Sequence, residues 1–172
     1  MRLKLAGNLA DKEYRIVRNA DATLAGTMAA GTPVVLQLNG TEDGMSVALP
    51  TTMGAAATQG LFYGILPAAL EYNVAGEAIS NGVCTNAKMT RMTRAASTDS
   101  WTSSASIASW AALSVDTINN AMTTVSASAG ASRYQAFAIL AQSCASSAAS
   151  ASATSDTRTA ITNAVKVWVN LL

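Results

Sequence analysis

The chain has 172 residues, of which 12% are charged, and its formal net charge is +1. It contains no histidine, which excludes the Ser-His-Asp and Cys-His nucleophile systems and most zinc sites. No apolar run approaches the ~18 residues that span a bilayer, the N-terminus lacks the apolar core of a secretory signal, and two cysteines do not make a disulfide framework.

The low fraction of charged residues can be interpreted in two ways. An ordinary soluble domain carries about 25% charged residues. A weakly charged surface rich in Ala, Ser and Thr suits a protein whose surface is largely occupied by neighbouring subunits. A soluble protein that covers itself with hydroxyl groups fits equally well, so composition alone leaves both interpretations open. The length predicts one domain, or one domain with a small appendage.

The first half of the chain is patterned as β-strands. The expected strands are 13–18, 33–38, 45–49 and 60–66. In the first of them, Tyr14 and Ile16 fall on one face, because successive side chains of a strand alternate. The last is bounded by Gly60 and Pro67 and is apolar on both faces, which indicates a buried strand.

Residues 33–49 are expected to form a β-hairpin. The polar segment 39–44, NGTEDG, supplies two Gly-containing turn signals between two alternating runs. The residues that share one face of each run are Val34, Leu36 and Leu38, and Met45, Val47 and Leu49. Pro50 ends the second strand, because proline has no N–H for the hydrogen-bond ladder.

Residues 71–89 are expected to form a meander of short strands, with turns at Ala75-Gly76 and Asn81-Gly82. Residues 97–122 fit two patterns. Ile107, Trp110, Ala111 and Ile118 fit a helical stripe, whereas Ile107, Ala111, Leu113 and Val115 fit a strand. Asp99 or Ser100 could cap a helix, and Asp116 could cap a short one that reaches Met122. Periodicity does not decide between helix and strand here.

The end of the chain carries its clearest strand pattern, at residues 164–172. Alternation sets Val165, Val167, Val169 and Leu171 against Lys166, Trp168 and Asn170. Residues 133–142 are a further strand candidate, so the Ala/Ser/Thr-rich segment 143–160 is expected to connect two strands. We expect this connection to be an ordered contact loop, with Asp156 and Arg158 as its only charges.

These segments together predict a mainly β fold. It would be a sandwich or barrel of about seven or more short antiparallel strands, with at most one or two short helices. The order of the segments contains no βα alternation and no internal repeat, which argues against a parallel α/β sheet.

No segment carries a catalytic or cofactor motif. The sequence has no GxSxG, P-loop, GxGxxG or EF-hand pattern. Glu42 and Asp43 are adjacent carboxylates, but beside Gly44 in a hairpin loop they serve turn chemistry far more often than catalysis. We expect no enzymatic activity, no cofactor and no metal; a histidine-free hydrolase that uses carboxylates is the least favoured alternative. Cys84 and Cys144 are expected to be small buried residues and not a disulfide pair.

Basic and aromatic residues are the candidates for an interaction surface. Lys88, Arg91 and Arg94 follow one another at intervals of three residues. Nucleic-acid binding needs a wider basic surface with stacking aromatics, so we interpret these residues as a solvated or partner-facing edge. Trp101 and Trp110 are either core residues or interface anchors, since tryptophan gives a large contact area at low entropic cost.

Several stretches resemble one known group of proteins. AAGTPVVLQLNG, GLFYGIL and EYNVAGEAISNGVCTNAKM resemble stretches of small tailed-bacteriophage capsid decoration, or cement, proteins. The run DSWTSSASIASWAALSVDT and the segment from Tyr134 to the end are similar to the same group. The resemblance extends from about residue 29 to the end, and rests on turn glycines and hydrophobic patterns instead of a catalytic signature.

The resemblance implies a β-rich domain over residues 29–172 that attaches to the outside of a phage head and stabilises the expanded shell. The implied partners are the major capsid protein and further copies of the chain in a homotrimer, with no nucleic acid, membrane or small-molecule substrate. The protein would be made in the host bacterial cytoplasm and lie on the outer surface of the virion. Residues 1–28, with the first expected strand, are interpreted as an arm that contacts the capsid.

The alternative is another virion β module, such as a tail or head-fibre subunit that binds a host-surface glycan. In either case the candidate interface residues are Arg2, Lys4, Lys88, Arg91, Arg94, Trp101, Trp110, Asp156 and Arg158.

Overall fold

The computed structural model describes eight segments of the chain. They are residues 12–23, 26–37, 44–53, 62–93, 110–116, 119–124, 137–142 and 157–170. The strands in these segments are β1 (Glu13–Asn19), β2 (Pro33–Leu36), β3 (Ser46–Ala48), β4 (Phe62–Ile65), β5 (Ala75–Thr93), β6 (Ala112–Asp116), β7 (Ala121–Thr124), β8 (Ala138–Leu140) and β9 (Thr157–Asn170). The helix α1 is Pro50–Met53. The predicted mainly β fold is therefore confirmed, and no helix in these segments is long and apolar enough to cross a membrane.

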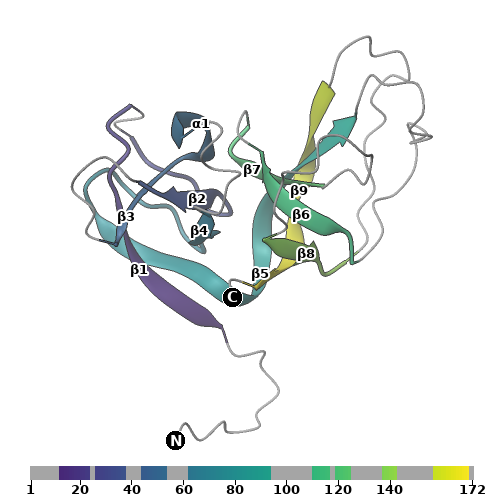
Figure 1. The fold of residues 1–172 in the computed structure, drawn as a ribbon, viewed down its shortest axis with the longest axis horizontal. Coiled ribbons are helices and arrows are strands. Elements are labelled where there is room, and N and C mark those ends of the chain that lie inside the picture. Colours follow the sequence, from purple (N-terminus) through teal and green to yellow (C-terminus); the bar gives the residue numbers. More distant parts are fainter. Residues whose placement is uncertain are drawn as a thin grey trace, which may run out of the picture.

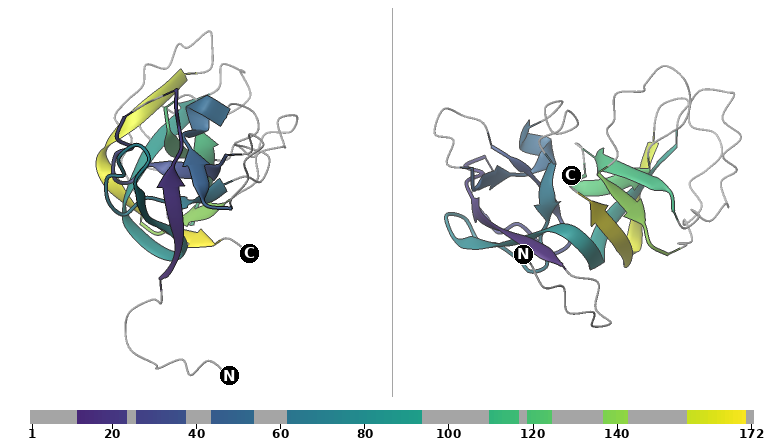
Figure 2. Two further views of the ribbon diagram at one scale, coloured as in Figure 1. Left: turned by 90° about the vertical axis from the view of Figure 1, so that its left-hand side faces the viewer. Right: turned by 60° about the horizontal axis from the view of Figure 1, so that its bottom comes forward.

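The strands form a closed five-stranded barrel with further strands joined to it. β1, β3, β2, β4 and β5 pair in that order, and β5 pairs back with β1, which closes the ring. The remaining strands continue from β5 in the order β7, β6, β8 and β9, and β9 pairs back with β5. The molecule thus contains two rings of five strands that share β5 (Figure 1). Figure 2 shows β5 passing from the first barrel into the second.

Two features of the predicted sheet were wrong. Two strand pairs, β1–β3 and β5–β7, are parallel, whereas the prediction had antiparallel strands only. A parallel pair needs a crossover connection, and in the first barrel that crossover contains β2. The strands are also not all short, since β5 has 19 residues and β9 has 14.

Most of the predicted meander at residues 71–89 is instead part of the single long strand β5, which begins at Ala75. Neither Ala75-Gly76 nor Asn81-Gly82 forms a turn. Gly76 lies against Leu70, whose Cδ1 would be 2.7 Å from a Cβ at position 76. Gly82 has a φ of 104°, an angle that glycine adopts without steric cost. Both glycines therefore serve close approach and a local change of direction inside a strand, a role that sequence does not distinguish from a turn.

Each barrel has its own apolar core. The first contains Val17, Met28, Val34, Val47, Leu49, Leu66, Leu70 and Ala78. The second contains Cys84, Ala87, Met89, Leu113, Val115, Met122, Ala138, Leu140, Val165, Val167 and Val169, together with the side chains at the junction described next. β5 contributes to both cores, with Ala78 in the first and Ile79, Cys84, Ala87 and Met89 in the second.

The two barrels are joined by side chains as well as by β5. Phe62 of β4 stacks on Phe137, which precedes β8, with 5.0 Å between the ring centroids. Both rings are buried, and they lie in one cluster with Ile65 and Ile79. A backbone link adds to this contact, because the Lys88 N–H donates to the Gly31 carbonyl at 2.8 Å.

The predicted hairpin at residues 33–49 is confirmed, with Val35 opposite Ala48 and Leu36 opposite Val47. Met45 is nevertheless exposed, because β3 begins only at Ser46 and Met45 does not share the buried face of Val47 and Leu49. Pro50 ends the strand as predicted and also begins α1, as suits a residue with a fixed φ.

Buried Asp21 holds the start of α1. Its carboxylate accepts hydrogen bonds from the Leu49 N–H at 3.0 Å and from the Thr52 hydroxyl at 2.6 Å. It also accepts one from the Thr23 N–H at 3.1 Å. A buried carboxylate is stable only when it is satisfied in this way, so Asp21 has a structural role in the first barrel.

The region that fitted both helix and strand contains the hairpin β6–β7, in which Val115 lies opposite Met122. Asp116 therefore caps no helix that reaches Met122. Its carboxylate instead accepts hydrogen bonds from the Asn119 side-chain amide at 2.9 Å and from the Thr90 hydroxyl at 2.7 Å. These contacts favour a turn over a helix at this point.

β9 confirms the alternation predicted for the end of the chain. Val165, Val167 and Val169 are buried, and the residues between them are exposed. β9 begins at Thr157, however, so residues 157–160 belong to the strand and not to the predicted contact loop. The long pairing with β5 explains this difference, because Thr157 still has a partner in Thr93.

The prediction of an arm at residues 1–28 concerns residues that lie in part outside the described segments. Inside them, β1 pairs with β3 and β5, and Met28 forms a bridge with Leu70. The boundary at residue 28 stays a prediction.

Candidate functional site

Five of the predicted interface residues lie outside the described segments: Arg2, Lys4, Arg94, Trp101 and Asp156. Asp156 directly precedes β9 in the sequence. Their role at an interface stays a prediction.

The other basic candidates come from two neighbouring strands. Lys88 is exposed on β5, and Arg91 follows in the same strand. Arg158, predicted in a loop, belongs to β9, where it pairs with Met92 while Thr159 pairs with Arg91. The backbone positions of Arg91 and Arg158 are therefore on adjacent rungs of the sheet. The sequence did not indicate this proximity, because the residues are far apart along the chain.

Trp110 is an exposed residue with unusual backbone geometry. Its side chain is 81% exposed, which contradicts its interpretation as a core residue. Its φ is 74°, in a region that few residues other than glycine adopt. The Trp110 N–H donates to the Leu140 carbonyl at 2.7 Å, which fixes the backbone directly before β6. An exposed indole on a fixed backbone is a suitable anchor for a partner.

Trp168 is a second exposed tryptophan that the candidate residues did not include. It lies on β9 between Val83 of β5 and Ile139 of β8, in register with both. Paired residues of a sheet share a face, so these three side chains form an apolar row on the outside of the second barrel. The signal was present in the sequence, because alternation set Trp168 against the buried valines.

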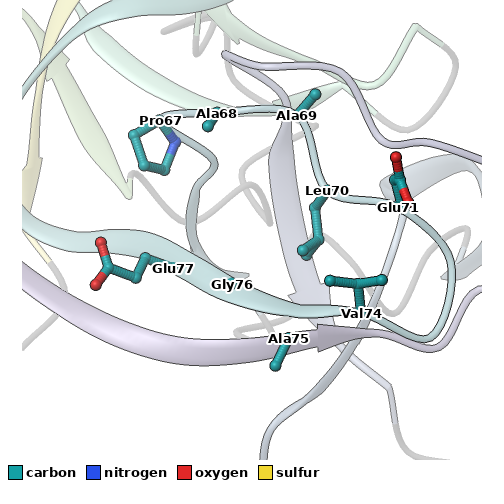
Figure 3. Close-up of a pocket in the computed structure, with 9 residues that line it drawn as sticks. All are labelled: Pro67, Ala68, Ala69, Leu70, Glu71, Val74, Ala75, Gly76 and Glu77. Carbon is teal, nitrogen blue, oxygen red and sulfur yellow. The ribbon is translucent and has the colours of Figure 1, made fainter.

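A pocket lies in the first barrel, between residues 67–71 and the start of β5 (Figure 3). Its volume is about 310 Å³. Leu70 and Val74 give it an apolar lining, and Glu71 and Glu77 add two exposed carboxylates. Gly76 also lines the pocket, and because it has no side chain Leu70 can lie close to β5.

The described residues contain no group of three or more His, Cys, Asp or Glu side chains that could hold a metal ion. The buried carboxylates Asp21 and Asp116 serve the structural contacts described above. Glu42 and Asp43, the adjacent carboxylates noted in the sequence, lie outside the described segments.

Cys84 is buried in the core of the second barrel, as predicted, and its thiol lies 3.1 Å from the Asn86 side-chain oxygen. Burial raises the pKa of this thiol above its ordinary value of 9.0.

In a Cys144→Ser variant we expect a soluble thiol reagent to label Cys84 of the native protein at least about a hundredfold more slowly than Cys84 of protein unfolded in guanidinium. The reason is that the thiolate is the reactive form. Equal labelling rates in the two conditions would contradict the buried position.

The same pKa shift has a consequence for stability. Above pH 9.0 an unfolded chain loses the thiol proton before the folded chain does. The contribution of Cys84 to stability is therefore present at neutral pH and is lost as the pH rises past this value.

Comparison with known proteins does not assign the chain to a family. No protein-family model matches the chain, and no curated protein matches it.

Proposed function

We propose that the chain is a virion structural protein that binds the outer surface of a phage capsid and stabilises the expanded head as a homotrimer. The observation that carries the proposal is the pair of exposed tryptophans, Trp110 and Trp168, in a chain with few charged residues. Tryptophan is among the residues most enriched at the energetically dominant positions of protein interfaces, so these exposed indoles are suitable anchors. The resemblance to capsid decoration proteins supports the same function.

A cement protein acts by binding, and the energetics of such binding suit this chain. A copy that contacts several capsid subunits at once is held by avidity, so each contact need add only a modest free energy. A protein that binds only the expanded shell also stabilises that state by mass action. Rigid β-barrels lose little conformational entropy on docking, which favours this mode of action.

The test uses purified protein and undecorated expanded heads. We expect the protein to cosediment with the heads and to raise the temperature at which they break open. A Trp110→Ala variant is expected to bind about tenfold more weakly or worse, because a buried indole at an interface is often worth this much. Tyr72→Ala, which removes a less exposed aromatic ring from the first barrel, is the matched control and should bind like the original protein.

Absence of cosedimentation at any protein concentration, with no change in the heat resistance of the heads, would refute the proposal. Equal losses in the two variants would argue that Trp110 is not the anchor.

A second candidate is a host-glycan-binding module of the virion, which the same tryptophans favour because sugars stack on exposed indole rings. The Val83–Trp168–Ile139 row would form the platform. Binding of immobilised glycans that is lost in Trp168→Ala, together with no binding to heads, would favour this second function.

A further inference from the structure

Exposed carboxylates are distributed unequally between the two barrels, although the first barrel also exposes the cations Lys12, Arg15 and Arg18. Among the residues whose side chains the structure describes, every exposed carboxylate belongs to the first barrel: Glu13, Glu71 and Glu77. Over the same part of the chain, the exposed charged side chains of the second barrel are the cations Lys88 and Lys166. The one described carboxylate of the second barrel, Asp116, is buried against Thr90.

Lys166 and Trp168 form a compact feature on the outside of the second barrel. They are two residues apart on β9, so they share a face and their Cα atoms are about 7 Å apart. Both are exposed, while Val167 between them is buried in the core. β9 pairs with β5 on one side and β8 on the other, which holds this face rigidly.

The pocket of the first barrel has the complementary properties. Its apolar lining, with Leu70 and Val74, suits a flat aromatic ring, and its volume of about 310 Å³ is near the lower end for small-ligand pockets. Glu71 and Glu77 offer carboxylates to a cation beside that ring. No ion pair joins either glutamate to another residue of the described segments.

We propose that these two surfaces bind each other between copies of the chain. Trp168 of one copy enters the pocket between residues 67–71 and 74–77 of the next, and Lys166 pairs with Glu71 or Glu77. The proposal rests on the oligomeric part of the proposed function and names its contact. It does not depend on the capsid.

Charge complementarity favours a second copy as the occupant and favours a head-to-tail contact. Two β9 faces would bring lysine against lysine, and two pockets would bring glutamates together, so neither surface suits a contact with itself. A contact between two different surfaces generates a ring when the rotation closes, and a trimer is one such ring. The pocket belongs to the first barrel and β9 to the second, so one copy can use both surfaces at once. Figure 1 shows the positions of β5 and β9.

The experiment mixes two variants that each lack one surface. The first carries Lys166→Glu and Trp168→Ala, and the second carries Glu71→Lys and Glu77→Lys. Sedimentation is expected to give a closed oligomer for the original protein and a monomer for each variant alone. An equimolar mixture is expected to give a dimer and nothing larger, because one intact contact remains per pair and no ring can close.

The controls are Lys12→Glu and Glu13→Lys, which reverse exposed charges outside the two surfaces and should leave the oligomer intact. Far-UV circular dichroism checks that each variant is folded. The proposal is overturned by a monomeric original protein at about 100 µM, by an oligomer that persists in either variant, or by a mixture that stays monomeric. Cosedimentation with heads is measured separately, so the capsid function can fail or survive independently of this contact.

Discussion

Replacing Gly31 by alanine is expected to destabilise the protein by roughly 3 kcal/mol or more, a loss typical of backbone strain at a special position. Gly31 has a φ of 78°, and a Cβ there would be 2.0 Å from the Asn86 carbonyl oxygen. That oxygen belongs to β5 at a register shift in its pairing with β9, between Cys84 and Ala87. Asn86 is held at this point because its side-chain amide donates to the Pro67 carbonyl at 3.0 Å. Gly31 also donates to the Leu66 carbonyl at 2.8 Å, so movement of the loop would break a hydrogen bond. Urea unfolding followed by circular dichroism measures the loss.

Gly44→Ala is the matched control for this substitution. Gly44 has a φ of 70°, close to that of Gly31, but a Cβ there would meet no atom within 4 Å. Its replacement should cost only the backbone conformation, about 1 kcal/mol. The difference between the two variants therefore measures the close contact with β5. Equal unfolding midpoints would contradict that contact.

Local patterns in the sequence predicted most of the strands. β9 is the clearest case, because a half-buried strand places Val165, Val167 and Val169 on one face and polar or aromatic residues on the other. β4 was predicted from apolar residues on both faces, and its two faces do contact different cores, with Phe62 in one cluster and Tyr63 against the other. These predictions succeeded because the burial of each strand residue is reflected directly in its own side-chain type.

The path of β5 and the closure of the barrels could not be predicted in the same way. Gly76 and Gly82 gave turn signals, and only the contact with Leu70 and the pairing with β9 explain their place inside a strand. The parallel pairing of β5 with β7 joins Met89 to Met122, and no local pattern specifies such a distant partner. Sequence alternation says which face of a strand is buried but does not name the strand beside it.

The candidate surfaces were only partly predictable for a related reason. Trp110 was left between core and interface, since its positive φ and exposure depend on the turn before β6. Trp168 could have been included from alternation alone. The pocket beside Glu71 and Glu77 could not, because it arises where the segment before the turn runs beside β5.

Replacing Phe62 by alanine is the second substitution with a large expected effect, a loss of about 3–5 kcal/mol. The Phe62 ring is buried, extends from β4 of the first barrel, and stacks on Phe137 at the second. Its removal leaves a cavity at the junction and also removes the aromatic contact. Urea unfolding should show a single transition at lower denaturant, because β5 still contributes to both cores. Tyr14→Ala removes an exposed ring from β1 and should change stability by less than about 0.5 kcal/mol.

A double-mutant cycle separates the contact between the two rings from the burial of each. Phe62→Leu and Phe137→Leu keep much of the apolar volume at the junction but remove the stacking at 5.0 Å. We expect a coupling free energy of about 0.5–1.5 kcal/mol between them, the usual range for an aromatic pair. Additive losses would mean that the rings are buried independently. The link between the barrels would then rest on β5 and on the hydrogen bond from the Lys88 N–H to the Gly31 carbonyl. In that case Gly31→Ala, more than Phe62→Ala, is expected to make the two barrels unfold in separate transitions.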